Sequence, residues 1–175
     1  INELLTLASL RSTDIEYTPV DIHSVIIEAS NRLKLLIDER KAEIILAGEY
    51  PPILGHAPWL VEVLVNLITN AITYGGDPPK VEIGADAPLN GFVRYWVKDN
   101  GNGIDPLDQD KLFQDFSRLR SHSAGGHGLG LSITRRIITK LGGAVGVESS
   151  GQPGEGATFW FRLACAGSIP TAAGS

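Results

Sequence analysis

The sequence has a single cysteine, Cys165, and no methionine among its 175 residues. One cysteine forms neither an intramolecular disulfide nor a cluster of thiolate metal ligands, so a disulfide-stapled secreted scaffold and a cysteine metal centre are excluded. A reducing compartment is the default for such a chain, and we expect a cytoplasmic domain. Because the sequence does not start with methionine, we expect it to come from a longer protein, in which a sensor or membrane segment would lie upstream.

Long apolar runs and long basic runs are missing as well. No stretch reaches the roughly 20 apolar residues of a membrane-spanning helix, and there is no signal-peptide pattern. The formal net charge is −5, with 15 lysines and arginines against 20 aspartates and glutamates, which argues against nucleic acid as the main partner. None of the histidines stands with an acidic residue or cysteine at a metal-ligand spacing, and we interpret all four as surface or loop residues. They are His23, His56, His122 and His127.

What remains is an ordinary globular composition, 43% hydrophobic and 20% charged, in a chain long enough for one domain with a core. Periodicity predicts helices over residues 1–10, 22–40, 59–75, 111–116 and 128–141, and strands over 15–18, 43–46, 53–54, 80–85, 92–98, 144–148 and 158–163. These elements predict an α+β fold, a two-layer α/β sandwich whose mixed sheet is covered on one face by helices. Asn90-Gly91 predicts a hairpin turn. Residues 165–175 are small and polar, and we expect a disordered tail.

The helix expected over residues 59–75 carries a polar strip on an otherwise apolar surface. Glu62, Asn66, Asn70 and Tyr74 recur every four positions and therefore share one face. Asparagine costs about 0.5–0.7 kcal/mol against alanine inside a helix, so two of them one turn apart call for a reason. One interpretation is a solvated strip, and the other is the wall of a polar pocket.

A glycine-containing loop follows the strand expected over residues 92–98. Its sequence is Asp99-Asn100-Gly101-Asn102-Gly103. Glycines there permit positive φ and let a ligand approach the backbone, and Asp99 could accept a hydrogen bond from an exocyclic amine. The alternative is an ordinary Asn-Gly turn that Asp99 caps.

A second glycine run leads directly into the helix expected over residues 128–141. Its sequence, Gly125-Gly126-His127-Gly128-Leu129-Gly130, brings free N–H groups to a helix N-terminus, which suits phosphate. The run is neither a P-loop nor a dinucleotide fingerprint, because no Lys-Ser/Thr follows and the glycine spacing differs. A flexible hinge is the alternative. Residues 117–127 are polar and unpatterned, which predicts a mobile segment.

Taken in order, these motifs resemble the ATP-binding catalytic domain of sensor histidine kinases, in the wider family of DNA gyrase, heat-shock chaperones and mismatch-repair ATPases. The resemblance extends over residues 53–163. The helix with Asn66 and Asn70 is similar to the N box, and residues 99–103 are similar to the first glycine box. Residues 113–116 with Arg118 resemble the F box, residues 126–131 the second glycine box, and residues 154–159 the last one. One such box alone would be weak evidence, but five boxes in the order of the family are a specific sign of this resemblance.

The resemblance implies a role for each box. Asn70 and Asn66 would hold Mg²⁺ and the phosphates of ATP, which suits a cation that takes few protein oxygens. Tyr74 would pack against adenine, and Asp99 would read its amino group. Residues 117–127 would form an ATP lid, from which Arg118 reaches the γ-phosphate. The remaining nucleotide-binding residues would be Gly101 and Gly103 in the base pocket, and Gly126, Gly128, Leu129 and Gly130 at the phosphates.

Three departures from the family pattern stand out. Thr73 replaces the lysine or arginine that often precedes the tyrosine, so Arg120 or Lys111 would have to supply that phosphate contact. His127 stands where a small hydroxyl residue is usual. The phosphoacceptor box, a histidine followed by an acidic residue, is absent. We therefore interpret residues 1–14 as the end of a truncated dimerisation and phosphoacceptor domain, and residues 15–164 as the catalytic domain.

The resemblance implies a histidine protein kinase that transfers the γ-phosphate of ATP to a histidine on the upstream helices, for relay to the receiver domain of a response regulator. The fragment would then be a monomer and the full-length protein a homodimer. One alternative is an ATPase or a serine-directed kinase of the same fold. Asn66 disfavours it, because ATPase relatives place a water-activating glutamate there and an amide takes no proton at neutral pH. The other alternative is a degenerate domain that only docks a partner.

Overall fold

The computed structural model describes residues 5, 8, 10, 11, 15–114 and 130–167 of the chain. The elements in order are β1 (Thr18–Val20), α2 (Ile22–Arg32), α3 (Lys34–Arg40), β2 (Glu43–Leu46), β3 (Ile53–Gly55), α4 (Ala57–Tyr74), β4 (Lys80–Ala85), β5 (Phe92–Asp99), α5 (Pro106–Gln109), α6 (Gly130–Lys140), β6 (Ala144–Glu148) and β7 (Thr158–Ala164). Five strands form one sheet in the order β2-β4-β5-β7-β6, and β1 pairs with β3 in a separate two-stranded sheet. Only β2 and β4 pair in parallel, so the main sheet is mixed, as predicted.

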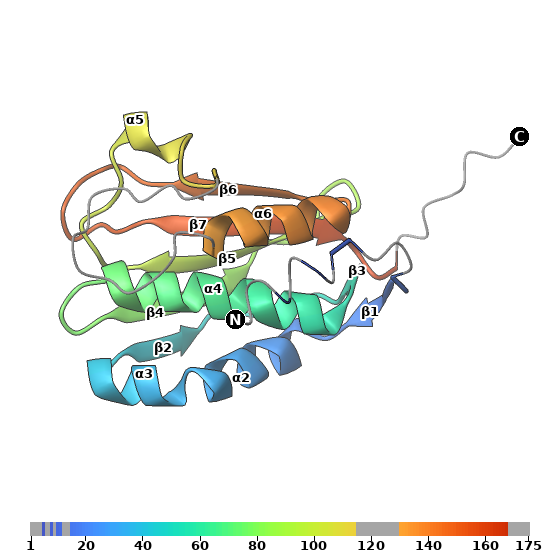
Figure 1. Ribbon diagram of the computed structural model, residues 1–175, viewed down its shortest axis with the longest axis horizontal. Coiled ribbons are helices and arrows are strands. Elements are labelled where there is room, and N and C mark those ends of the chain that lie inside the picture. Colours follow the sequence, from blue (N-terminus) through green and yellow to red (C-terminus); the bar gives the residue numbers. More distant parts are fainter. Residues whose placement is uncertain (1–4, 6–7, 9, 12–14, 115–129, 168–175) are drawn as a thin grey trace, which may run out of the picture.

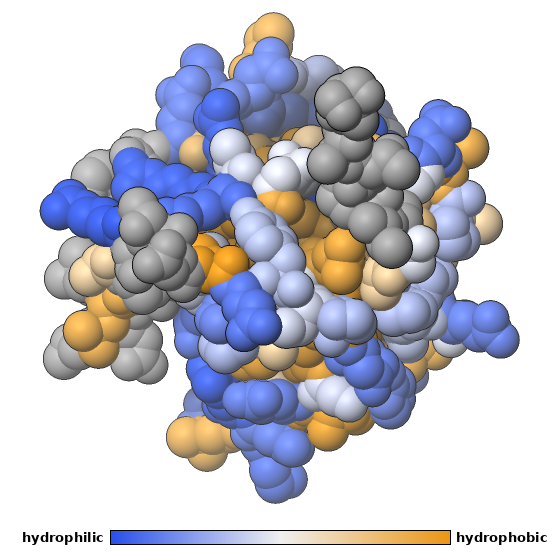
Figure 2. Space-filling view, turned by 90° about the vertical axis from the view of Figure 1, so that its right-hand side faces the viewer, coloured by the Kyte–Doolittle hydropathy of each residue, from blue (hydrophilic) through white to orange (hydrophobic). Residues whose placement is uncertain are grey.

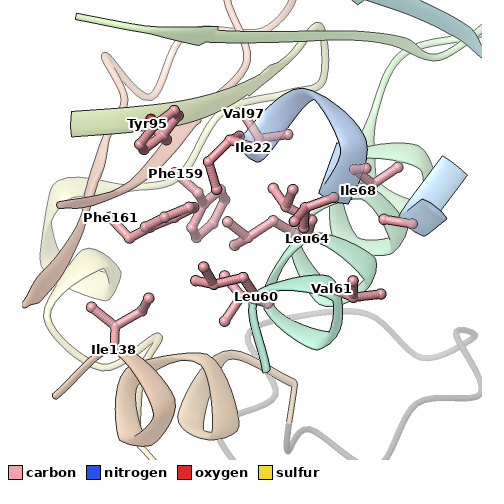
Figure 3. Packing of buried hydrophobic residues seen from close by; sticks show 14 of the residues in the cluster. Ile22, Leu60, Val61, Leu64, Ile68, Tyr95, Val97, Ile138, Phe159 and Phe161 are labelled. Atoms are coloured by element: carbon pink, nitrogen blue, oxygen red, sulfur yellow. The ribbon is translucent and has the colours of Figure 1, made fainter. Parts of the chain in front are cut away.

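The helices α2, α4 and α6 lie side by side over one face of the main sheet (Figure 1). Strand alternation explains why that face is apolar: Tyr95, Val97, Phe159 and Phe161 are buried, whereas their sequence neighbours Lys98 and Arg162 are exposed. The side chains that fill the layer between sheet and helices are shown in Figure 3 and include Ile22, Leu60, Leu64, Ile68 and Ile138. Each such side chain contributes about 1.5–3 kcal/mol by leaving water. The predicted two-layer α+β fold is confirmed.

The outer face of the sheet carries an aromatic row. Gly84, Trp96, Trp160 and Gly146 are consecutive cross-strand neighbours on β4, β5, β7 and β6. Each tryptophan ring lies over the adjacent glycine, since an added Cβ would stand 2.3 Å from Trp96 Cζ2 at Gly84 and 2.3 Å from Trp160 Cζ2 at Gly146. The Arg94 guanidinium lies 5.6 Å from the centroid of the Trp160 ring. The glycines thus give room for flat aromatic packing on a solvent-facing surface.

Several element boundaries differ from the prediction. Residues 22–40 form two helices, because the chain bends at Leu33, whose φ and ψ are −98° and 7°. The bend leaves Leu33, Leu36 and Ile37 partly buried against the core. The first strand is three residues long and starts at Thr18 instead of Ile15, because its pairing with β3 defines it.

The short helix near the predicted F box also begins earlier than expected. It covers Pro106–Gln109, where the Asp105 side chain caps the Leu107 N–H and proline occupies the first turn. Residues 111–114 form turns, and the rest of the expected helix lies outside the described residues. The hairpin at Asn90-Gly91 is confirmed, with positive φ at both residues (52° and 81°).

The described residues near both ends of the sequence are held to the domain by hydrogen bonds. Figure 2 shows the face at the right-hand side of Figure 1, where hydrophobic atoms appear between hydrophilic residues. Tyr17 donates from its hydroxyl to the Lys140 carbonyl at 2.9 Å, and the Lys140 ammonium donates to the Leu10 carbonyl. The first residues of the expected tail are held in place, since Cys165 N donates to Gly91 O at 2.9 Å and Ala166 N to Pro52 O at 3.1 Å. Of the described helices, none has the length and hydrophobicity needed to cross a membrane.

Candidate functional site

The polar strip of α4 forms one wall of the candidate site. Glu62, Asn66 and Asn70 are half-buried, and Tyr74 at the end of the helix is 47% exposed. The strip has specific partners at two positions. Arg32 of α2 donates from Nη1 to Glu62 Oε1 at 2.8 Å, and Asn66 donates from Nδ2 to the Gly130 carbonyl at 3.2 Å. These contacts connect the strip to α2 and to the first residue of α6.

Asp99 closes β5 as a buried carboxylate that is 6% exposed. Its Oδ1 accepts hydrogen bonds from Gly101 N at 2.9 Å and from Ala157 N at 3.2 Å. Burial raises the pKa of the Asp99 carboxyl, and the two backbone hydrogen bonds oppose that rise. Oδ1 therefore caps the turn, and the described structure gives no hydrogen bond to Oδ2.

Glycines surround Asp99 because backbone segments meet there. At Gly156 φ is +68°, and an added Cβ would stand 1.9 Å from the Asp99 carbonyl oxygen. At Gly101 an added Cβ would stand 2.0 Å from the carbonyl oxygen of Tyr74. The Gly101 carbonyl in turn accepts hydrogen bonds from Gly154 N and Gly156 N, both at 3.0 Å. The first and last glycine boxes and the end of α4 thus form one tightly packed unit.

A second set of hydrogen bonds holds the loop after Gly101. Gly103 has φ +76°, and its Cα lies against Ser149, where a Cβ would approach Oγ to 2.9 Å. Ser149 Oγ accepts from Ile104 N at 2.9 Å and donates to Gly156 O at 2.9 Å. Gln109 Nε2 donates to both Ile104 O and Ser149 O at 3.0 Å. Sequence reasoning assigned no role to Ser149 or Gln109, and only the box pattern around residues 154–159 pointed to this region.

Of the second glycine run, residues 125–130, the structure describes only Gly130. This residue begins α6, and its carbonyl accepts from both Asn66 Nδ2 and Thr134 Oγ1, the latter at 2.9 Å. The predicted helix over residues 128–141 is present from Gly130 to Lys140. Of the other predicted residues, Arg118, Gly126, Gly128 and Leu129 lie outside the described residues, together with the expected lid over 117–127, Arg120 and His127.

A groove of about 740 Å³ lies beside Gly154 and Gly156. Its lining comes largely from the outward-facing residues Lys80, Glu82, Lys98 and Thr158 of the sheet and from the loop after β6. It borders Asp99 and Gly156 but includes neither Asn66 nor Asn70. This groove therefore belongs to the face away from the helices, and the candidate site is defined by the contacts of Asp99 and α4 instead.

Metal binding by side chains of this chain alone has little support. Within the described residues, no group of three or more histidines, cysteines, aspartates and glutamates could hold an ion. A metal held by amide oxygens together with a ligand's phosphates needs no such group. The half-buried carboxamides of Asn66 and Asn70 suit that second arrangement.

Comparison with known proteins identifies the family of this chain. Residues 55–166 match the model of the family described as histidine kinase-, DNA gyrase B-, and HSP90-like ATPase. The phytochrome-like protein Cph1 of Synechocystis is 36% identical over 165 residues, which cover 93% of this chain and 22% of that protein. The sensor-like histidine kinase SenX3 of Mycolicibacterium smegmatis is 33% identical over 171 residues, 93% of this chain and 43% of that protein.

A solved structure extends the comparison to the fold. Full-length ShkA in complex with AMPPNP has a TM-score of 0.75 and 33% identity, over 94% of this chain and 35% of that one. The chain thus spans less than half the length of these relatives. Because the family model matches residues 55–166, which is more than half of the chain, the chain belongs to the histidine kinase-, DNA gyrase B- and HSP90-like ATPase family.

Proposed function

We propose that this chain is the ATP-binding catalytic domain of a sensor histidine kinase, which transfers the γ-phosphate of ATP to a histidine on a separate helical domain. The observation that carries the proposal is the buried Asp99 carboxylate, with Oδ1 fixed by two backbone N–H groups and Oδ2 left for a ligand. The upstream dimerisation helices and a response regulator receiver domain are the proposed partners, with nucleic acid excluded. We propose a cytoplasmic location, a monomeric fragment and a homodimeric full-length protein.

Asp99 suits recognition of the adenine amino group. A hydrogen bond between an exocyclic amine and a carboxylate is worth roughly 1.5–3 kcal/mol. Gly101 leaves no space between the loop and the end of α4, so the base would lie close to backbone atoms and beside Tyr74. Gly103 supports the same loop through Ser149.

Asn66 and Asn70 suit the phosphates and Mg²⁺. Mg²⁺ takes oxygen ligands, keeps several waters and neutralises phosphate charge, so one or two amide oxygens are sufficient protein ligands. Because Asn66 Nδ2 donates to Gly130 O, its Oδ1 is the atom that would face the ligand. The N–H groups of Gly126, Gly128, Leu129 and Gly130 would bind phosphate oxygens at the start of α6, and Arg118 would reach the γ-phosphate. Lys111 or Arg120 would supply the positive charge that a lysine or arginine at the position of Thr73 often provides in the family.

Transfer to another group is favoured over hydrolysis. The position where ATPase relatives hold a water-activating glutamate is Asn66, whose amide accepts no proton at neutral pH. The nearest carboxylate on the same strip, Glu62, is one turn further away and is paired with Arg32 at 2.8 Å. A general base must be available to the attacking group, and neither residue meets that requirement.

Calorimetric titration of this chain with ATP, with and without Mg²⁺, tests the nucleotide site. We expect saturable, Mg²⁺-dependent binding that Asp99→Asn abolishes and that Asp86→Asn, a surface carboxylate on the outer face, leaves unchanged. Absence of binding by the unaltered chain would contradict the proposal.

Incubation with γ-labelled ATP tests the acceptor. We expect no label on the chain alone and acid-labile label on the upstream helical domain of the same protein when it is added. Acid-stable label would instead indicate a serine-directed kinase, and release of inorganic phosphate as the sole product would indicate an ATPase.

A further inference from the structure

Asn100 stands between the two residues of the first glycine box that meet the base pocket, yet its side chain is turned toward the loop between α4 and β4. Its Oδ1 accepts hydrogen bonds from Gly76 N and from Lys80 N, both at 2.8 Å. Its Nδ2 donates to the Pro78 carbonyl at 3.2 Å. One side chain thus bonds to the beginning, the middle and the end of the segment that connects the two elements.

The Asn100 side chain is also closely packed against the backbone of Gly75 and Gly76. A Cβ on Gly76 would stand 2.7 Å from Asn100 Nδ2 and 3.0 Å from its Cγ. A Cβ on Gly75 would stand 2.5 Å from the Ala71 carbonyl and 3.3 Å from Asn100 Oδ1. The amide therefore lies directly against the backbone that ends α4, with no space for another side chain.

The position of this contact matters because Tyr74 and Asp99 are on different elements. Tyr74 ends α4 and Asp99 ends β5, and both elements end on the same side of the molecule, where α5 lies (Figure 1). The backbones of Gly101 and Tyr74 touch at this point. The hydrogen bonds of Asn100 are the side-chain links that the described structure places between the segment after Tyr74 and the segment after Asp99.

We propose that Asn100 is a positioning residue for base recognition, which holds the end of α4 with Tyr74 at a fixed distance from the Asp99 carboxylate. The proposal rests on the proposed function, since it assumes that adenine binds between these residues. Loss of the amide leaves two backbone N–H groups without their acceptor, that of the part-buried Gly76 and that of the exposed Lys80. An unpaired N–H costs free energy where water does not reach it, so the loss falls mainly on Gly76 at the end of α4. The segment 76–80 would then rearrange to find other partners, and the spacing between Tyr74 and Asp99 would change with it.

The test compares ATP with inosine triphosphate, which has the same phosphates but a carbonyl in place of the amino group. A variant that only lowers the folded fraction lowers the apparent affinity for both nucleotides by the same factor. The ratio of the two affinities therefore reports base recognition alone. For the unaltered chain we expect a preference for ATP of at least about tenfold, from one hydrogen bond to a charged group.

Three variants complete the experiment. Asn100→Ala should reduce the preference for ATP about fivefold or more, a loss of roughly one hydrogen bond's discrimination. Asn100→Asp keeps the Oδ1 acceptor for both Gly76 N and Lys80 N and should keep the preference within about twofold. Asn31→Ala removes an exposed amide on α2 and should change neither affinity.

The outcomes separate the inference from the proposed function. If the unaltered chain does not bind ATP, the proposed function fails. If it binds ATP and Asn100→Ala keeps the full preference, Asn100 is a structural residue only and the inference is wrong. Should Asn100→Ala fail to fold, Asn100→Ser, which keeps one hydrogen-bonding oxygen, takes its place; a reduced preference supports the inference and an unchanged one overturns it.

Discussion

Asn66 of α4 donates a hydrogen bond to the carbonyl of Gly130, the residue at which α6 begins. Two helices that are more than 50 residues apart in sequence are thereby fixed to each other at the side of the site proposed for the phosphates. The same carbonyl accepts from Thr134 Oγ1, so it is fully engaged and Asn66 is held in one orientation. Asn70, one turn further along α4, has no such partner in the described structure and is the freer of the two amides to bind a metal.

This difference predicts how the two asparagines respond to metal removal. Asn70→Ala should abolish the gain in ATP affinity that Mg²⁺ gives, because the variant loses a metal ligand. Thr69→Ala, the half-buried neighbour, should retain the gain. Titrations with Mg²⁺ and with EDTA check this. An Asn70→Ala variant that still binds ATP more tightly with Mg²⁺ would show that the ligand lies elsewhere.

Asp99 predicts opposite effects of pH on stability and on binding. Burial raises the pKa of its carboxyl above the ordinary value of 3.8, so the contribution of this group to the stability of the free chain is largest below that value and is lost as the pH rises through the raised pKa. Only the ionised form accepts a hydrogen bond with both oxygens, so the preference for ATP over inosine triphosphate should increase over the same range.

Asp99→Asn provides the check on that pH dependence. The amide oxygen can still accept from Gly101 N and Ala157 N, while the buried charge is gone. We therefore expect the variant to have a higher Tm than the unaltered chain at pH 7 and to bind no ATP. A lower Tm at pH 7 would mean that the carboxylate is stabilised by its surroundings.

Gly154 and Gly156 form a matched pair for testing the close packing at the base pocket. Both have positive φ, +85° and +68°, and both donate to the Gly101 carbonyl. Gly154 has open space around its Cα, so alanine there should cost only the roughly 1–2 kcal/mol of a left-handed conformation. At Gly156 alanine would also meet the Asp99 carbonyl at 1.9 Å, and we expect a clearly larger loss of stability together with loss of ATP binding. Equal losses in urea unfolding would refute the importance of that contact.

Glu62 tests the distinction between transfer and hydrolysis. Because it is paired with Arg32 and lies one turn before Asn66, Glu62→Gln should leave unchanged whatever rate of phosphate release from ATP the unaltered chain has. The ion pair is partly exposed, so its loss should cost no more than about 1 kcal/mol. Phosphate release that falls at least about tenfold, as expected on removal of a general base, would identify Glu62 as a catalytic residue instead.

The sequence predicted α4 well because its signal is local. Eighteen residues with a 3.6-residue apolar period and a proline in the first turn define the helix within two residues at its start. The break at Leu33 was not predictable in this way, since Leu33, Leu36 and Ile37 continue the same period on either side of it. The sequence did contain a signal for the short helix at Pro106, because Asp105 and Pro106 are a typical helix start. The prediction instead followed the apolar residues further along the chain and placed the helix too late.

The site was predictable as a set of motifs but not as a set of contacts. Resemblance to a family pointed to Asp99 and to the glycine boxes. The pairing of Arg32 with Glu62 and the hydrogen bonds of Asn100 to Gly76 and Lys80 join residues 20–30 positions apart. Nothing in the pattern around Arg32 or Asn100 specifies those partners, because a long-range contact depends on how the elements pack.

The aromatic row on the outer face predicts a loss of stability that does not reach the site. Gly146→Ala would force the Trp160 ring off the strand, since the new Cβ would stand 2.3 Å from Cζ2, and such overpacking costs about 1–3 kcal/mol. Trp160→Ala removes the clashing ring, so the double variant should be less destabilised than the sum of the single variants. Urea unfolding of all four forms measures this coupling. Additive losses would mean that the cost of Gly146→Ala does not come from the Trp160 ring.

ATP affinity should stay within about twofold in each variant that remains folded, because α4 lies on the other face of the sheet and no binding energy is lost there. A weakened ATP affinity would mean that the outer face is coupled to the pocket.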